Sequence, residues 1–288
     1  MSEPIAIHAP LTSRVGLAGF TVGVAIVAFI AVVALVGNQL VPQDPFIQDL
    51  GNRLKPPFWM EGSQPGHLLG TDQLGRDYLA RLAYGARISL LIGIMTVITS
   101  GLIGITLGVL GGFFGGRVDD AVLFAITTRL SIPVVLVALA VVGLMGSGLG
   151  LVVATLGLLL WDRFAVVARV TTMQIRSLDY VNAARCAGAS TPHLLIREIL
   201  PNIASHLAVV ATLEMALAIL LEAALSFLGL GVPPPLPSWG LMIAEGKDYM
   251  FFSPWVIMVP GVALFVLVLG INLVGDGLRN LLGSERLR

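Results

Sequence analysis

Long stretches without a charged residue decide what this chain can fold into. No Asp, Glu, Lys or Arg occurs between Arg14 and Asp44, or between Arg87 and Arg117. About 20 apolar residues are enough to cross the hydrocarbon core of a bilayer. Only 12% of the residues are charged and 56% are hydrophobic, whereas a soluble domain carries about 25% charged residues. The chain is therefore predicted to be an all-α polytopic membrane protein.

The gaps between charges predict six membrane-spanning helices, with five as the alternative. The stretch 130–161 is free of charge but too long for one span, so we place a turn at 146–150 within it. Arg129 then falls inside the third span, where a charge is tolerated only near an end or in a wet interior. The predicted single transmembrane domain, 1–288, has an N-terminal segment (1–15), spans over 16–38, 88–110, 121–144, 149–168, 203–229 and 253–275, loops over 39–87, 169–202 and 230–252, and a tail over 276–288.

Arginine and lysine indicate the orientation of these spans. Within 163–201, arginines outnumber the two acidic residues, Asp179 and Glu198. Loops on the cytoplasmic side carry an excess of Lys and Arg. Both termini are therefore predicted to be cytoplasmic, and the loop over 39–87 to be external. Residues 71–87 of that loop are predicted to form an amphipathic helix on the outer surface, which either receives a partner or seals the rim of the bundle.

The polar segment DYVNAARCAGASTPHLLIREILPN, residues 179–202, lies between two predicted spans. Asp179 is placed to cap a first short helix, and Gly188 to end it in the left-handed conformation. Pro192 suits the start of a second helix, and Pro201 is predicted to end it. Isolated helices shorter than about 12–15 residues are marginal in water. The segment is therefore predicted to be a small, rigid plug for a partner's pocket.

This segment resembles the cytoplasmic EAA loop of bacterial ABC importer permeases. In that loop E-A-A is followed by three residues, then glycine, and eleven positions on by Ile-x-Pro. Asparagine stands here where the family usually has glutamate, and the literal EAA at 222–224 lies inside the fifth predicted span. The resemblance implies that the matching residues couple the chain to an ATPase. These residues are Asn182, Ala183, Ala184, Gly188, Ile199 and Pro201.

Three further blocks, 69–93, 222–240 and 272–282, resemble the C-type subunit of dipeptide, oligopeptide and nickel permeases. The resemblance implies the type I permease fold and half of a translocation pathway in a bacterial cytoplasmic membrane. It also implies a heterodimer with a B-type permease, two cytoplasmic ATPase subunits or one fused ATPase, and an extracytoplasmic peptide-binding protein. ATP and magnesium would be bound by the ATPases, and no cofactor by this chain. Transport of a nickel complex or another small solute is the alternative, and an ion-coupled secondary transporter is less favoured.

The residue pattern gives no sign of catalysis, of a metal site or of nucleic-acid binding. The only Gly-Lys pair, Gly246-Lys247, has Leu241 where a P-loop requires glycine. None of the four histidines accompanies a G-x-S-x-G serine. The formal net charge is zero, so bulk charge does not indicate a nucleic-acid partner.

Two acids and three glycines within the spans remain to be assigned. Glu214 and Glu222 lie nearly on one face of the fifth predicted span, and a carboxylate in lipid is costly. They are predicted to line the pore, with a structural hydrogen bond as the alternative. Gly104, Gly108 and Gly112 allow another helix to come close, either inside this chain or at a heterodimer seam.

Overall fold

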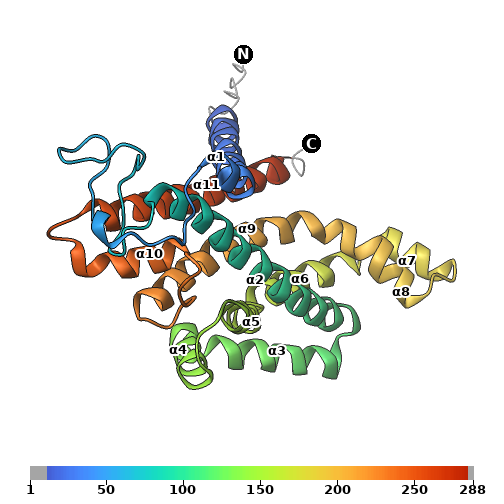
Figure 1. Cartoon of the computed structure of the whole chain (residues 1–288). Helices are drawn as coiled ribbons and strands as arrows, with labels where there is room; N and C mark the ends of the chain where they lie inside the picture. The colour runs from blue at the N-terminus through green and yellow to red at the C-terminus, as the bar shows by residue number, and fades with distance from the viewer. Residues whose placement is uncertain (1–11, 285–288) are drawn as a thin grey trace, which may run out of the picture.

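The structure is a computed structural model that describes residues 12–284. Those residues are almost entirely helical, and the one β pairing among them is an isolated bridge between Thr71 and Asp77. Figure 1 shows the arrangement of the helices. The α-helices are α1 (Thr12–Leu40), α2 (Tyr78–Phe114), α3 (Gly116–Leu130), α4 (Val134–Met145), α5 (Leu149–Leu159), α6 (Asp162–Ile175), α7 (Asp179–Cys186), α8 (Thr191–His193), α9 (Leu200–Phe227), α10 (Trp239–Gly246) and α11 (Trp255–Ser284). Short 3-10 helices, η1 (Leu50–Asn52) and η3 (Lys247–Tyr249), and a π-helical segment, η2 (Leu194–Ile199), complete the list.

Five of these helical stretches are long and apolar enough to cross a membrane, and a sixth span results if α3 and α4 count as one bent crossing. The helices are therefore compatible with both predicted counts, six spans or five. The five stretches are Leu17–Gly37, Tyr78–Phe114, Leu149–Ile175, Thr191–Phe227 and Trp255–Leu281.

The third predicted span is not one straight helix, which corrects the prediction of a helix over 121–144. The chain turns by 79° between α3 and α4. Pro133 precedes the first residue of α4 in an extended conformation. Proline has no backbone N–H and disfavours helical geometry at the residue before it. This proline therefore accounts for the break.

The fourth span is also interrupted, at residues 160–161 between α5 and α6. It extends to Ile175 rather than ending near residue 168. The added part contains Arg169, which the sequence had assigned to the following loop, whereas Arg163 lay within the predicted span, 149–168. The fold thus brings two broken spans together in one bundle.

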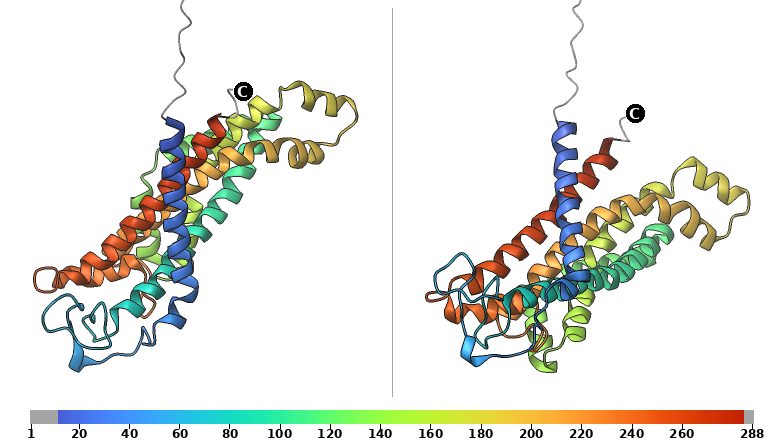
Figure 2. Two further views of the ribbon diagram at one scale, coloured as in Figure 1. Left: turned by 90° about the horizontal axis from the view of Figure 1, so that it is seen from above. Right: turned by 45° about the horizontal axis from the view of Figure 1, so that its top comes forward.

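The ends of the helices separate into two groups (Figure 2). The start of α1, the end of α11 and the α7–α8 hairpin lie toward one end of the bundle. The segment 41–77, α10 and the start of α11 lie toward the other end. This arrangement is the one expected if the two ends of the chain and the hairpin share one side of the membrane.

Helix α2 packs along α6 through the three glycines singled out in the sequence. A Cβ atom on Gly104 would lie 2.2 Å from the carbonyl oxygen of Trp161, and one on Gly108 would lie 2.4 Å from that of Ala165. A Cβ on Gly112 would likewise meet the α6 backbone at 2.6 Å. The glycines therefore serve packing inside this chain, the first of the two predicted alternatives.

The predicted amphipathic helix over 71–87 is wrong. Residues 71–77 form turns, and the helix begins at Tyr78 as the first residue of α2. Gly75 has a φ of +76°, and a Cβ there would clash with the carbonyl oxygen of Asp49 at 1.7 Å, so the chain bends at this glycine instead of coiling. Asp77 caps α2 by accepting a hydrogen bond from the Ala80 N–H at 2.7 Å.

A buried ionic cluster holds this turn segment against α10, a helix that the sequence did not predict. Arg81 is fully buried and donates to Glu245 at 2.7 Å. Arg76 lies 2.6 Å from the carboxylate of Asp72 and 3.4 Å from that of Glu245. The two arginines and two acids balance one another, which allows the charges to stay buried.

Candidate functional site

The α7–α8 hairpin projects from the bundle (Figures 1 and 2). Among the eight residues of α7, only Val181 is buried. A helix this short is marginal in water without a surface to pack against. The exposed face of α7 is therefore available to a partner.

A hydrogen-bonded turn closes the end of α7 as the sequence predicts. Gly188 has a φ of +87°, and its N–H donates to the carbonyl of Arg185 at 3.0 Å. The N–H of Ala189 donates to the carbonyl of Ala184, also at 3.0 Å. These two bonds form a Schellman motif, which usually requires glycine at the left-handed position.

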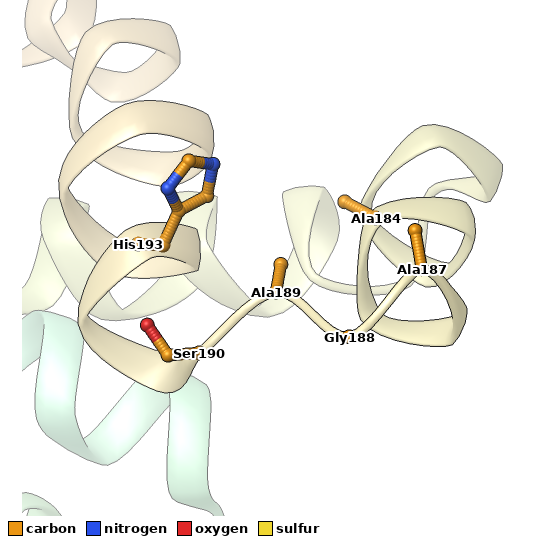
Figure 3. A pocket seen from close by; sticks show the side chains of 6 residues that line it. All are labelled: Ala184, Ala187, Gly188, Ala189, Ser190 and His193. Atoms are coloured by element: carbon orange, nitrogen blue, oxygen red, sulfur yellow. The ribbon is translucent and has the colours of Figure 1, made fainter.

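An open groove of about 470 Å³ lies between α7 and the start of α8 (Figure 3). Ala184 and Ala187 stand on one side, His193 stands on the other, and Gly188 and Ala189 run between them. Small side chains bury little area themselves but let another backbone approach closely. The hairpin thus presents a concave surface in addition to the projecting shape expected from its sequence. The lining residues are Ala184, Ala187, Gly188, Ala189, Ser190 and His193.

The starts and ends of the two hairpin helices differ in part from the prediction. Asp179 is the first residue of α7, with Leu178 in the capping position, and no side chain caps this end. Ser190 precedes α8, and Pro192 lies in the first turn of that helix.

Pro201 does not end the second helix, which corrects the sequence prediction. The helix runs on through the π-helical η2 into α9, where the N–H of Leu200 bonds to the carbonyl of Leu195. In a regular α-helix the ring of a proline clashes with the carbonyl four residues earlier. The wider turn before Pro201 accounts for the helix continuing past it.

Apolar contacts fix the base of the hairpin to the bundle. Val181 and Ile199 have no exposed surface, and Leu194 is 2% exposed. Ile199 packs in one cluster with Phe164 and Ile203. Burying a side chain of this size stabilises a structure by about 1.5–3 kcal/mol. The hairpin is therefore anchored to α6 and α9 rather than hanging free.

Two arginines contact the end of α2: Arg185 on α7 and Arg176 directly after α6. The guanidinium of Arg185 lies over the ring of Phe113, 5.7 Å from its centroid. Arg176 donates to the carbonyl of Phe113 at 2.9 Å. Tyr180 of α7 accepts a hydrogen bond from Asn202 of α9 at 3.2 Å. Burial, followed by the nearby Glu198 carboxylate, raises the pKa of the Tyr180 hydroxyl.

The residues predicted to couple to an ATPase do not all lie on the hairpin surface. Asn182, Ala183 and Gly188 are exposed on α7 and its turn, and Ala184 is half-buried at the groove. The remaining two, Ile199 and Pro201, lie on the helix that follows: the isoleucine is fully buried and the proline is exposed. The first four can touch a partner directly, whereas Ile199 can act only through packing.

The two acids predicted to line the pore have different surroundings. Glu222 is fully buried and accepts hydrogen bonds from the hydroxyls of Ser226 and Ser238, both at 2.8 Å. Glu214 is 1% exposed and lies 3.2 Å from the guanidinium of Arg163. Their role in a pore remains a prediction.

Sequence reasoning did not foresee the charged groups around Glu214. Arg129, which the sequence placed inside a span, donates to the backbone carbonyl of Leu159. Its Nη2 lies 3.5 Å from the carboxylate of Asp162. A pair of adjacent charges at 162–163, directly after a long apolar run, was the signal available in the sequence.

These observations define a multi-pass membrane protein with broken spans and a projecting helical hairpin. A family model described as "Binding-protein-dependent transport system inner membrane component" matches residues 104–287. The chain therefore belongs to this family of ABC importer permeases. The match includes the hairpin and both broken spans.

Similar proteins cover most of the chain. It is 43% identical over 263 residues to the di/tripeptide transport system permease protein DppC of Pseudomonas aeruginosa, which covers 91% of this chain and 87% of that protein. It is 39% identical to the dipeptide transport system permease protein DppC of Escherichia coli K12, over 93% of this chain and 89% of that protein. A glutathione transport system permease protein, GsiD of Pectobacterium atrosepticum, is 40% identical over 78% of this chain and 75% of its own length.

Solved structures of ABC transporters have the same fold. A chain of the MetNI methionine ABC transporter, in inward-facing conformations, aligns with a TM-score of 0.56 at 20% identity. The alignment covers 68% of this chain and 93% of that chain. The all-α architecture predicted from the sequence, with the type I permease fold, is therefore confirmed.

Proposed function

We propose that this chain is the C-type permease subunit of an ATP-driven peptide importer and forms half of its translocation pathway. The observation that carries the proposal is the 43% identity, over 91% of the chain, to a permease named for di- and tripeptide transport. The relative named for glutathione supports the same substrate class, since glutathione is itself a small peptide. These relatives favour a peptide over the alternative substrate, a nickel complex.

The hairpin is the proposed coupling element. A cytoplasmic ATPase would pack against α7 and the groove at Ala184 and Gly188, where small side chains permit close approach. ATP and magnesium would be bound by the ATPase subunits, either two chains or one fused chain. A B-type permease would complete the pathway, and an extracytoplasmic binding protein would deliver the peptide. This arrangement places both termini in the cytoplasm of a bacterial cell, beneath the inner membrane.

Transport by the reconstituted complex tests the proposed function. The chain, its partner permease and the ATPases are placed in liposomes, and uptake of a labelled dipeptide delivered by the binding protein is measured with and without internal or external ATP. We expect uptake to require ATP on the hairpin side. Uptake driven by an ion gradient without ATP would instead identify a secondary transporter.

A matched pair of variants tests the coupling role of the groove. Ala184→Asp places a charge where close packing is required, and a buried unpaired charge is costly. We expect it to abolish co-purification of the ATPases and peptide-stimulated ATP turnover. Ala184→Ser adds only a small neutral hydroxyl and should retain both. Unchanged turnover in the aspartate variant would remove the groove from the coupling mechanism.

A further inference from the structure

A small set of charged side chains lies at mid-depth in the bundle. Arg163 is near the middle of the span Leu149–Ile175. At 1.5 Å per residue, it lies about 20 Å from either end. It pairs with Glu214, and Arg129 and Asp162 form a second ion pair near that glutamate. Charges at this depth are expensive and mark a polar path or a buried pair.

Two of these charged groups, Arg129 and Asp162, form an ion pair with each other inside the chain. Arg129 contacts the carboxylate of Asp162 and donates to backbone carbonyls at both helix breaks, those of Leu159 and Ile132. These carbonyls lie where the breaks interrupt the helical hydrogen bonds, so the guanidinium satisfies them. Arg129 is thereby assigned a structural role.

Arg163 is different because most of its guanidinium has no partner among residues 12–284, the part of the chain that the structure describes. Within those residues its polar contact is the ion pair of Nη1 with Glu214 at 3.2 Å. A guanidinium carries five N–H donors in a planar fork. The side chain of Arg163 is 57% exposed, whereas that of Glu214 is 1% exposed. Arg163 is therefore the exposed member of the ion pair, and Glu214 is the buried member.

An exposed guanidinium at this depth cannot face lipid tails without a large free-energy cost. It must face either a water-filled pathway or another subunit. Glu214 contacts one nitrogen of the guanidinium and leaves the other donors free for a ligand. Such a fork matches the two oxygens of a carboxylate, which it binds by strong charge-assisted hydrogen bonds.

We propose that Arg163 faces the translocation pathway and binds the C-terminal carboxylate of a peptide in transit. The inference rests on the proposed function, since it names a substrate contact for a peptide importer. Every peptide with a free C-terminus carries this carboxylate, whatever its side chains. A single arginine could therefore serve many peptide sequences, with Glu214 supplying the buried counter-charge.

The test replaces the arginine with a thiol and then restores its charge. The natural chain has a single cysteine, Cys186, which is exposed on α7. The reference is therefore Cys186→Ser, assembled with cysteine-free partner subunits in liposomes, and the test chain adds Arg163→Cys. Peptide uptake and ATP turnover are measured at saturating loaded binding protein. Thiol reagents carrying an ethylammonium, a methyl or an ethylsulfonate group are then applied.

We expect Arg163→Cys to lower the number of peptides transported per ATP by at least about tenfold, since hydrogen bonds to charged groups are the stronger ones. The ethylammonium reagent should restore most of this ratio, while the methyl and sulfonate reagents should not. Restoration after assembly excludes a folding defect as the cause. Arg169→Gln is the matched control on the same helix: this arginine pairs with Asp119 inside the chain, so its loss should lower stability but not the ratio.

Two results would overturn the inference. A thiol at position 163 that no reagent reaches in the assembled transporter would place the residue against the partner permease. Equal restoration by neutral and cationic reagents would show that no positive charge is needed. Failure of the reference transporter to take up peptide at all would instead refute the proposed function, which this experiment measures first.

Discussion

Replacing Gly188 with alanine tests whether the shape of the hairpin, rather than its composition, governs the contact with the ATPases. The glycine has a φ of +87°, and a Cβ atom there would meet no heavy atom within 4 Å. The substitution therefore adds no clash, and its cost is purely conformational. An L-residue in the left-handed conformation costs about 1–2 kcal/mol.

This cost should appear in ATPase binding. Helix α7 buries only Val181, so the strain can be relieved by opening the turn locally, without unfolding the bundle. Docking must then close the turn again. A free-energy cost of 1–2 kcal/mol corresponds to a factor of about 5–30 in an equilibrium constant. We expect the apparent affinity of the permease pair for the ATPases to fall by that factor, measured with the permeases in lipid nanodiscs.

The chain provides a matched control for this experiment. Gly229 has a φ of +79° and no heavy atom within 4 Å of a built Cβ. It closes the same kind of turn at the far end of α9, where the N–H of Leu230 bonds to the carbonyl of Leu225 at 2.8 Å. Gly229→Ala should thus carry the same cost without changing ATPase affinity. Gly188→Asn should bind nearly as well as the natural chain, because asparagine tolerates the left-handed conformation. Equal binding by Gly188→Ala and the natural chain would refute the reasoning.

Two further predictions concern the stability of the bundle. Gly108→Val places a side chain 2.4 Å from a carbonyl oxygen of α6 and should cost about 1–3 kcal/mol, as overpacking does, seen as a lower Tm of the purified protein; Gly143→Val, with open space around it, should leave Tm unchanged. Glu245→Gln removes the charge that faces the fully buried Arg81 at 2.7 Å. It should lower stability by up to about 3–5 kcal/mol, because Asp72 is then the one carboxylate left to compensate two buried arginines; a Tm equal to that of the natural chain would show that this carboxylate suffices.

The features that the sequence predicted well depend on local chemistry. Spans follow from runs of apolar residues, and the first predicted span, 16–38, agrees with the observed Leu17–Gly37. The turn at Gly188 follows from the preference of glycine for the left-handed conformation. The spacing of Gly104, Gly108 and Gly112 correctly indicated a close helix contact. Each of these signals lies within one continuous stretch of the sequence.

The features that it missed depend on contacts between distant residues. Nothing local indicates that Arg163 on α6 meets Glu214 on α9, or that Arg129 reaches the break after α5. The end of the hairpin was misjudged for a related reason: Pro201 breaks a regular α-helix, but a π-helical turn before it lets the helix continue. The break at Pro133 had a local signal, the proline itself. The apolar residues around it nevertheless led to the prediction of one continuous span.

The positions of the hairpin and of the exposed arginine suggest how motion could pass between them. Helix α6 carries Arg163 in its first turn and ends at Ile175, four residues before α7. Helix α9 carries Glu214 and is continuous with α8 through η2. Ile199 and Phe164 pack together between these two helices. A displacement of the hairpin by an ATPase would therefore act on both members of the ion pair through packed helices. The close contact of α2 with α6 at Gly104, Gly108 and Gly112 ties α2 to the same packed unit.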